Sequence, residues 1–259
     1  MSMTMVEIER QLKALRLNGM LTTLESRALQ ASQCNAVFVE ALSWLLQDEI
    51  DHRSSALKQR RFKASGLNEM KTLTDFDWGF NPKLPKREIY ELVTTKFIQN
   101  GEHALLIGAP GTGKSHIIKT IAHAAIQLYQ KTVYREAHVF FEDMFEAEQM
   151  GKKKKIFKLF TEADLLIIDD LFLRKKMPAD AADYLLDIII TRYSKRKSTA
   201  ITSNRPIEDW GQLLKDNAAS SAILDRLLHH GHLLKFEGKS YRLKEAAKRF
   251  FQKKDENKG

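Results

Sequence analysis

The sequence predicts an α/β fold in which a mainly parallel sheet lies between helices, preceded by a small all-α N-terminal domain. From about residue 86 onward, short apolar runs of strand length alternate with longer segments of helical period. That order is typical of a parallel sheet covered by helices on both faces. Before residue 66 only helical periodicity is present. The two patterns therefore predict two domains of different class.

The N-terminal domain is expected to span residues 1–67 and to hold three helices. A turn at Asn18–Gly19 is predicted to separate the first two. In the third, apolar residues at helical spacing fall on one face, and the pattern stops near Gly66. Those residues are Phe38, Leu42, Leu45, Leu46 and Ile50.

Residues 68–85 contain one glycine and two prolines, a composition typical of a linker. A helix is predicted from Lys86 to Gln99, and it leads into the first apolar run, Ala104–Ile107. Further strands are predicted near residues 132–135, 165–168, 198–203 and 232–237, with helices between them. Residues 86–259 are therefore expected to form the α/β domain.

A glycine-rich segment follows the first predicted strand directly and fits the pattern G-x-x-x-x-G-K-[ST]. The next residues, Ser115–Gln130, have helical period, so strand, loop and helix occur in the order that a phosphate-binding loop requires. Glycines let backbone N–H groups approach phosphate oxygens, and the following helix N-terminus adds positive potential. The residues expected to contact nucleotide are Gly108, Ala109, Pro110, Gly111, Thr112, Gly113, Lys114, Ser115 and His116. Lys114 is expected near the β- and γ-phosphates and Ser115 on Mg²⁺.

A phosphate-binding loop also needs an acidic site that holds the metal ion. The apolar run Leu165–Ile168 ends in Asp169 and Asp170, which is typical of a buried strand ending in a Walker B sequence. Asp169 is expected to bind Mg²⁺, usually through water, and Asp170 to polarise the attacking water. The alternative is a strand that merely ends in an acidic turn. The separation of 55 residues from Lys114 suits a fold in which this strand lies beside the phosphate-loop strand.

Two more residues are candidates for hydrolysis. Asn204 follows the apolar run of residues 199–203, where its amide could hydrogen-bond the γ-phosphate or the water; a turn-capping role is the alternative. Arg226 lies in a helical segment whose apolar residues define a buried side and leave the arginine near the exposed one. An exposed arginine is usually only solvated, but one supplied to a neighbouring subunit stabilises charge on a transferring phosphoryl group.

The net charge of +9 is concentrated in two segments. Residues 151–160 carry five lysines and no acid, and residues 239–259 carry eight basic and three acidic groups. Four of the lysines, Lys152, Lys153, Lys154 and Lys155, are consecutive, and clustered lysines attract a polyanion by releasing its counterions. This favours DNA binding over a solvated loop for these four. For the C-terminal segment, DNA contact and the wet side of an amphipathic helix remain equal alternatives.

Cys34 is the only cysteine, which excludes an intramolecular disulfide and a cysteine metal cluster within this sequence. No apolar run approaches the roughly 20 residues needed to span a bilayer. We therefore expect a cytoplasmic protein without membrane contact.

Several strings together resemble the IstB-like helper ATPases encoded beside the transposase in two-gene insertion sequences, which are related to DnaC-type helicase loaders. The strings cover nearly the whole chain: Leu12–Met20, Gly108–Ser115, Leu166–Leu171, Thr202–Pro206, Ala222–His230 and Gly238–Leu243. The resemblance implies an AAA+ P-loop ATPase of the initiator-like clade, with no full C-terminal helical lid. It assigns Asn204 as sensor I and Arg226 as arginine finger, and leaves Arg242 as a candidate for sensor II.

The same resemblance implies which molecules the protein binds and which partner it engages. Members bind ATP, assemble as homo-oligomers on double-stranded DNA and engage a transposase, with the N-terminal helices helping assembly or partner contact. It also implies that the lysine run lies near the pore of the multimer and meets DNA. Two alternatives stay open: a helicase loader with the same chemistry acting on single-stranded DNA, and a small-molecule kinase, which would need an acceptor pocket and an arginine-bearing lid.

One position departs from the family pattern. Members usually have glycine after Asp-Asp-Leu, whereas this chain has Phe172. A bulky residue is expected to require an ordinary backbone conformation. If the usual glycine has positive φ, the loop beside the metal site would be altered here and hydrolysis slower.

Overall fold

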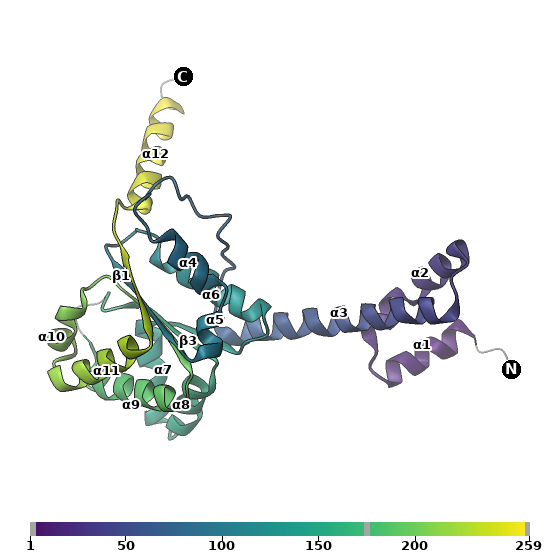
Figure 1. The fold of residues 1–259 in the computed structure, drawn as a ribbon, viewed down its shortest axis with the longest axis horizontal. Helices are drawn as coiled ribbons and strands as arrows, with labels where there is room; N and C mark the ends of the chain where they lie inside the picture. Colours follow the sequence, from purple (N-terminus) through teal and green to yellow (C-terminus); the bar gives the residue numbers. More distant parts are fainter. Residues whose placement is uncertain (1–3, 174–176, 257–259) are drawn as a thin grey trace. The chain divides into compact units, whose positions relative to one another are not determined.

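The computed structural model describes residues 4–173 and 177–256, and it divides into two compact units, residues 1–60 and 61–259. The first unit is helical and the second is α/β, which is the predicted order (Figure 1). The division between Arg60 and Arg61 falls inside the third helix. No helix in the described part of the chain is long and apolar enough to cross a membrane.

The first unit contains α1 (Met5–Ala14), α2 (Asn18–Cys34) and the first part of α3 (Phe38–Ser65). The predicted turn at Asn18–Gly19 is wrong, because these two residues begin α2. The carboxylate of Glu49 on α3 accepts hydrogen bonds from the backbone N–H groups of Gly19 (2.7 Å) and Met20 (3.3 Å). It thus satisfies donors that a helix N-terminus leaves free. A Cβ on Gly19 would lie 2.6 Å from the carbonyl oxygen of Asp48, so glycine permits the close approach of the two helices.

Five parallel strands form the sheet of the second unit in the order β2-β3-β4-β1-β5. Their bounds are β1 His103–Gly108, β2 Thr132–Glu136, β3 Leu165–Leu171, β4 Ser198–Ser203 and β5 Gly231–Phe236. The expectation that the acidic strand lies beside the phosphate-loop strand is wrong: β4 is inserted between β3 and β1. The carboxyl ends of all five strands still meet at one edge, because every pairing is parallel.

Helices cover both faces of this sheet (Figure 1). On one face lie α4 (Lys86–Val93), α5 (Lys96–Asn100) and α6 (Lys114–Gln127). On the other lie α7 (Ala137–Gln149), α8 (Lys153–Glu162), α9 (Ala181–Ser194), α10 (Trp210–Leu214) and α11 (Asn217–His229), with a short 3-10 turn at Ile207–Asp209. The helix predicted over Lys86–Gln99 is interrupted at Thr95, which has φ +62°.

Strand β3 shows how the two cores are separated. Leu165 and Ile167 belong to the cluster under α6, whereas Leu166 and Ile168 belong to the cluster under α7 to α11. Successive side chains of a strand point to opposite faces, so a continuous apolar run is buried on both sides. The same alternation directs Asp169, two residues after Ile167, toward the α6 face.

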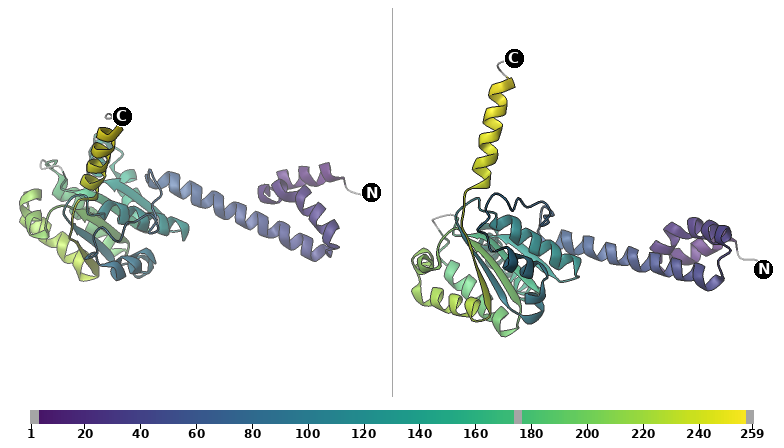
Figure 2. Two further views of the ribbon diagram at one scale, coloured as in Figure 1. Left: turned by 90° about the horizontal axis from the view of Figure 1, so that it is seen from above. Right: turned by 45° about the horizontal axis from the view of Figure 1, so that its top comes forward.

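Residues 68–85 form no helix or strand, but they belong to the second unit and are held against α6. A ring nitrogen of His116 lies 2.9 Å from the carbonyl oxygen of Thr72, and Lys119 pairs with Glu69 at 2.7 Å. Asn81 bonds both the N–H (2.9 Å) and the C=O (3.0 Å) of Lys239 in the connection between β5 and the last helix. That helix, α12 (Tyr241–Glu256), leaves the α/β body after β5 (Figure 2). The segment expected to be a linker is therefore fixed at two places.

Candidate functional site

The loop between β1 and α6 has the backbone that its glycines predict. Gly111 has φ +77° and Gly113 has φ +108°, a region that residues with a side chain rarely adopt. A Cβ on Gly113 would lie 2.7 Å from the ring of Phe76, and one on Gly111 would lie 2.1 Å from the hydroxyl oxygen of Ser240. Both glycines are thus required by space as well as by φ. The N-terminus of α6 opens onto this loop and favours an anion there.

Lys114, the first residue of α6, is almost fully buried, with 3% of its surface exposed. Its ammonium donates to the carbonyl oxygens of Gly108 (2.7 Å) and Ala109 (2.9 Å). Burial lowers the pKa of Lys114 to about 8, and the charges of Asp169 and Asp170 act in the opposite direction. A buried ammonium held by neutral carbonyls would gain from a phosphate anion at the same place.

Asp169 lies at the end of β3 on the α6 face and is 2% exposed. The hydroxyl of Ser115, in the first turn of α6, donates to its Oδ1 at 3.2 Å. A hydroxyl and a carboxylate meeting here are the hard oxygen donors that Mg²⁺ prefers. Within the described residues no group of three or more His, Cys, Asp or Glu side chains could hold a metal. A Mg²⁺ ion held by this pair would need further oxygen ligands, which phosphate and water commonly supply.

Asp170 reaches the same hollow by a different route. Strand alternation alone would turn it to the opposite face, but the pairing of β3 with β4 shifts register between Ile168 and Leu171, and Asp170 has φ +56°. Both carboxylates consequently line a hollow of 370 Å³ together with Lys114 and Ser115. Burial raises the pKa of Asp170, and the neighbouring charge of Asp169 raises it further. A carboxylate with a raised pKa is a better proton acceptor.

The lining of this hollow includes His116, Tyr241 and Arg242, but neither Asn204 nor Arg226. Asn204 follows β4, which lies between the strands that carry the loop and the carboxylates. Its side-chain oxygen is buried and has no hydrogen-bond partner among the described residues. Arg226 lies on α11 and donates to the carbonyl oxygen of Ala222 at 2.8 Å. The structure thus brings the loop and the two aspartates together and leaves Arg226 outside their hollow.

Sequence reasoning missed the side chains that hold Asp169. Tyr134 on β2 donates to its Oδ2 at 2.8 Å, and the hydroxyl of Thr202 on β4 donates to its Oδ1. Thr202 lies in one of the strings that carry the family resemblance, so a signal was present. Tyr134 stands in an ordinary edge-strand pattern and gave no signal.

An aromatic cavity of 110 Å³ adjoins the loop and was also missed. Its walls include Phe76, Phe80 and Tyr241, with Thr112 and Gly113 of the loop at one side. Phe80 and Tyr241 pack edge to face with ring centroids 5.3 Å apart. The backbone N–H of Tyr241 donates to the carbonyl oxygen of Gly111 at 2.9 Å, so α12 begins directly on the loop. Residues 68–85 and the start of α12 therefore belong to the site.

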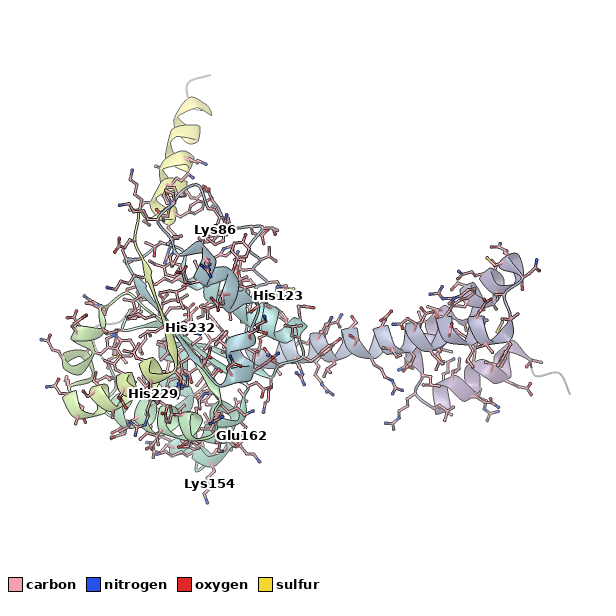
Figure 3. All side chains as sticks on the ribbon, in the orientation of Figure 1. Lys86, His123, Lys154, Glu162, His229 and His232 are labelled. Carbon is pink, nitrogen blue, oxygen red and sulfur yellow. The ribbon has the colours of Figure 1, made fainter. Side chains whose placement is uncertain are left out.

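The lysine run begins α8 and is not a loop: Lys152 is its N-cap, and Lys153 to Lys155 form its first turn. Lys152, Lys154 and Lys155 are exposed, and Lys154 projects away from the body of the unit (Figure 3). Lys153 differs, because it pairs with Glu148 at 2.7 Å and lies 5.2 Å from the ring centroid of Tyr184. Cations at a helix N-terminus are unfavourable because that end is already positive. An anion bound to the exposed lysines would remove this disadvantage.

The expectation that Phe172 has an ordinary backbone is wrong. Its φ is +64°, so it occupies the conformation that favours glycine. Its ring is 1% exposed and packs edge to face against Trp210, with centroids 5.1 Å apart. Left-handed backbone costs about 1–2 kcal/mol for a residue with a side chain. Burial of the phenyl ring contributes more, so packing enforces the conformation; residues 174–176, which follow, lie outside the described part.

A family model and two relatives identify the family to which this chain belongs. The model of the IstB-like ATP binding proteins matches residues 10–249. A Geobacillus stearothermophilus protein named for insertion sequence IS5376 and ATP binding is 35% identical over 226 residues, 87% of this chain and 89% of that protein. A Pseudomonas aeruginosa protein named for IS21 and ATP binding is 30% identical over 244 residues, 94% of this chain and 91% of that protein.

Solved structures agree on the fold. The DnaC helicase loader has a TM-score of 0.50 at 19% identity, covering 68% of this chain and 99% of that one. AMPPCP-bound DnaA from Aquifex aeolicus has a TM-score of 0.53 at 25% identity, covering 66% of this chain and 51% of that one. The predicted AAA+ P-loop fold and the family resemblance are both confirmed.

Replacing Phe172 with glycine tests whether ring packing outweighs the left-handed backbone. Deleting a buried phenyl side chain typically lowers the free energy of unfolding by about 3–5 kcal/mol. Glycine adopts positive φ without strain, which offsets about 1 kcal/mol of that loss. We expect Phe172→Gly to lower the free energy of unfolding by about 2–4 kcal/mol in urea titrations. Leu173, the exposed neighbour of Phe172, provides the control. Leu173→Ala should change the free energy of unfolding by less than about 0.5 kcal/mol. A Phe172→Gly variant more stable than the native chain would contradict this account.

Proposed function

The chain belongs to the family of IstB-like ATP-binding proteins, and we propose that it binds and hydrolyses ATP with Mg²⁺, assembles on double-stranded DNA and assists a transposase in DNA transposition. The observation that carries the nucleotide part is the hollow in which Lys114 and Ser115 face Asp169 and Asp170. Lys114 and Ser115 come from the loop and helix that follow β1, whereas Asp169 and Asp170 lie on β3, 50 or more residues later in the sequence. Their convergence is the arrangement that phosphoryl transfer needs.

In this proposal the backbone N–H groups of residues 108–115, except Pro110, which has none, bind the phosphates, and His116 continues that surface along α6. Lys114 exchanges its two loop carbonyls for β- and γ-phosphate oxygens. Ser115 and Asp169 would hold Mg²⁺, which would supply charge neutralisation on the phosphates. The aromatic cavity of Phe76, Phe80 and Tyr241 adjoins the loop and offers flat apolar surfaces on which a purine base can stack.

Hydrolysis would depend on Asp170, Asn204 and Arg226. Asp170 accepts a hydrogen bond from the attacking water and orients it, a role that its raised pKa supports. The amide of Asn204 is outside the lining of the hollow, and its side-chain oxygen is buried and unpartnered among the described atoms; in this proposal it turns toward the same water when nucleotide binds. Arg226 lies outside the hollow, so its role as arginine finger would be toward the nucleotide of a neighbouring subunit.

Duplex DNA is proposed to bind at the start of α8. Lys152, Lys154 and Lys155 are exposed there, and α8 is held firmly at its other end by Arg192 of α9. The Arg192 guanidinium is fully buried and donates to the carbonyl oxygens of Phe160 (2.5 Å) and Ala163 (2.9 Å). A helix start that bears three exposed lysines matches the regular charge of a phosphate backbone.

The first unit is proposed to serve assembly or contact with the transposase. Phe38, Leu42, Leu46 and Ile50 follow one another at intervals of four residues along α3, and all four are exposed. An apolar stripe of this kind on a helix usually marks an interaction surface. The transposase itself is proposed because the similar proteins are named for insertion sequences. Likeness to the DnaC loader supports only the shared fold.

Turnover measured with purified full-length protein tests the function. We expect long duplex DNA to raise both ATP hydrolysis and particle size, and single strands to raise them less. Lys114→Ala should abolish nucleotide binding, because its ammonium is the cation proposed to meet the β- and γ-phosphates. Stimulation by single strands alone would favour a helicase loader, and turnover that needs a small phosphate acceptor would favour a kinase.

The lysine run offers a matched pair of substitutions. Lys155→Gln and Lys154→Gln should each reduce the slope of log affinity against log salt by about 0.9, since each removes one phosphate contact. Lys153→Gln removes the same charge from a side chain already engaged by Glu148 and should change the slope much less. DNA binding that is equally sensitive at all three positions would contradict specific contact by the exposed lysines.

Mixing two inactive variants tests Arg226. Arg226→Ala should bind ATP normally but lose turnover by about a thousandfold or more, the usual value of an arginine finger. Adding Lys114→Ala subunits, which retain Arg226 but bind no nucleotide, should restore part of the activity in mixed assemblies. Normal turnover of Arg226→Ala alone in the assembled state would exclude the assignment.

A further inference from the structure

The hydroxyl of Tyr134 makes a buried contact with Asp169 that the proposed function does not yet use. Tyr134 lies on β2, is 4% exposed and packs in the apolar cluster beneath α6. Its Oη lies 2.8 Å from Oδ2 of Asp169, across the pairing of β2 with β3. An apolar cluster has no need of a hydroxyl, and a phenylalanine would fill the same space. The contact with Asp169 therefore explains why this position has a tyrosine hydroxyl.

The direction of each hydrogen bond at Asp169 follows from its partners. The N–H of Asp170 can only donate, and it donates to Oγ1 of Thr202 at 2.7 Å. Thr202 consequently has its own proton free to donate to Oδ1 of Asp169. Tyr134 is a donor as well, because an ionised carboxylate offers only acceptors and the phenol O–H lies 2.8 Å from Oδ2. Two neutral hydroxyls from the strands on either side of β3 thus hold the two oxygens of one carboxylate.

We propose that Tyr134, together with Thr202, is a positioning residue that orients Asp169 toward Mg²⁺ bound with the nucleotide. The inference rests on the proposed function, because it concerns the metal side of the same hollow. Each carboxylate oxygen accepts about two hydrogen bonds. Thr202 and Ser115 both donate to Oδ1, whereas Tyr134 alone donates to Oδ2, so Oδ2 keeps a place through which the carboxylate would face Mg²⁺. Tyr134 and Thr202 set the plane of the carboxylate and leave this place on Oδ2 open.

Tyr134 also ties this carboxylate to residues 68–85. The ammonium of Lys119 lies 5.7 Å from the Tyr134 ring centroid and pairs with Glu69 at 2.7 Å. Lys119, Glu69 and Tyr134 all line the hollow with Ser115 and Asp169. The Tyr134 ring is therefore restrained by Lys119 of α6 as well as by the apolar cluster in which it packs. A donor restrained in this way helps to fix the orientation of the carboxylate that it bonds.

The test is binding of mant-AMPPNP to full-length protein, followed by fluorescence without metal and then during titration with MgCl₂. Tyr134→Phe keeps the ring and removes only the hydroxyl. Its metal-free affinity for the analogue should equal that of the native chain, because the loop and Lys114 are unchanged. The MgCl₂ concentration for half-maximal tightening should rise about tenfold, the usual effect of losing a group that orients a metal ligand. Mn²⁺ binding followed by electron paramagnetic resonance should show the same shift.

Three variants complete the test. Thr202→Val should shift the metal dependence in the same direction, and Thr202→Ser, which restores a hydroxyl, should return it toward the native value. Tyr184→Phe is the matched control, because Tyr184 bonds Glu148 and packs in the cluster on the opposite face. A native chain that fails to bind the analogue would overturn the proposed function and this inference together. Native binding with an unchanged metal dependence in Tyr134→Phe, or a loss of metal-free affinity equal to the loss with metal, would overturn the inference alone.

Discussion

The buried carboxylate of Asp169 is the group around which the second unit is organised. A charge taken out of water is strongly destabilising unless hydrogen bonds surround it. Here the donors come from three elements: Ser115 at the start of α6, Tyr134 on β2 and Thr202 on β4. Satisfying that one charge therefore fixes the position of the phosphate-loop helix relative to both neighbours of β3. The same fixation is what a nucleotide site requires, since reacting groups must be held before the substrate arrives.

Beyond Asp169 the chain leaves regular strand geometry at once. The register shift and the left-handed conformations of Asp170 and Phe172 reverse the usual alternation within three residues. Asp170 is thereby turned to the hollow, and Phe172 is turned inward against Trp210. A phenylalanine in place of the usual glycine is thus accommodated by the core. The backbone that glycine would adopt freely is imposed here by packing.

The site also extends well outside the loop and the two aspartates. Residues 68–85 supply Phe76 and Phe80, and the root of α12 supplies Tyr241. Asn81 joins these two segments, which are more than 150 residues apart, by bonding both backbone groups of Lys239. Because α12 begins on the carbonyl of Gly111, the phosphate loop and the basic C-terminal helix share a backbone contact. Through this contact the basic helix α12 begins beside the proposed nucleotide site.

The sequence alone determined the class of fold, the five strands, the phosphate loop and the pair of aspartates, because these depend on local patterns: apolar runs, glycine spacing and strand ends. Strand order, the contacts of residues 68–85, the engagement of Lys153 by Glu148 and the left-handed Phe172 were decided only in the tertiary structure. Each depends on contacts between residues remote in sequence, for which hydrophobic period carries no information. Tyr134 shows the limit most clearly. In the sequence it is one aromatic residue in an edge strand, and only the parallel pairing of β2 with β3 brings its hydroxyl to Asp169.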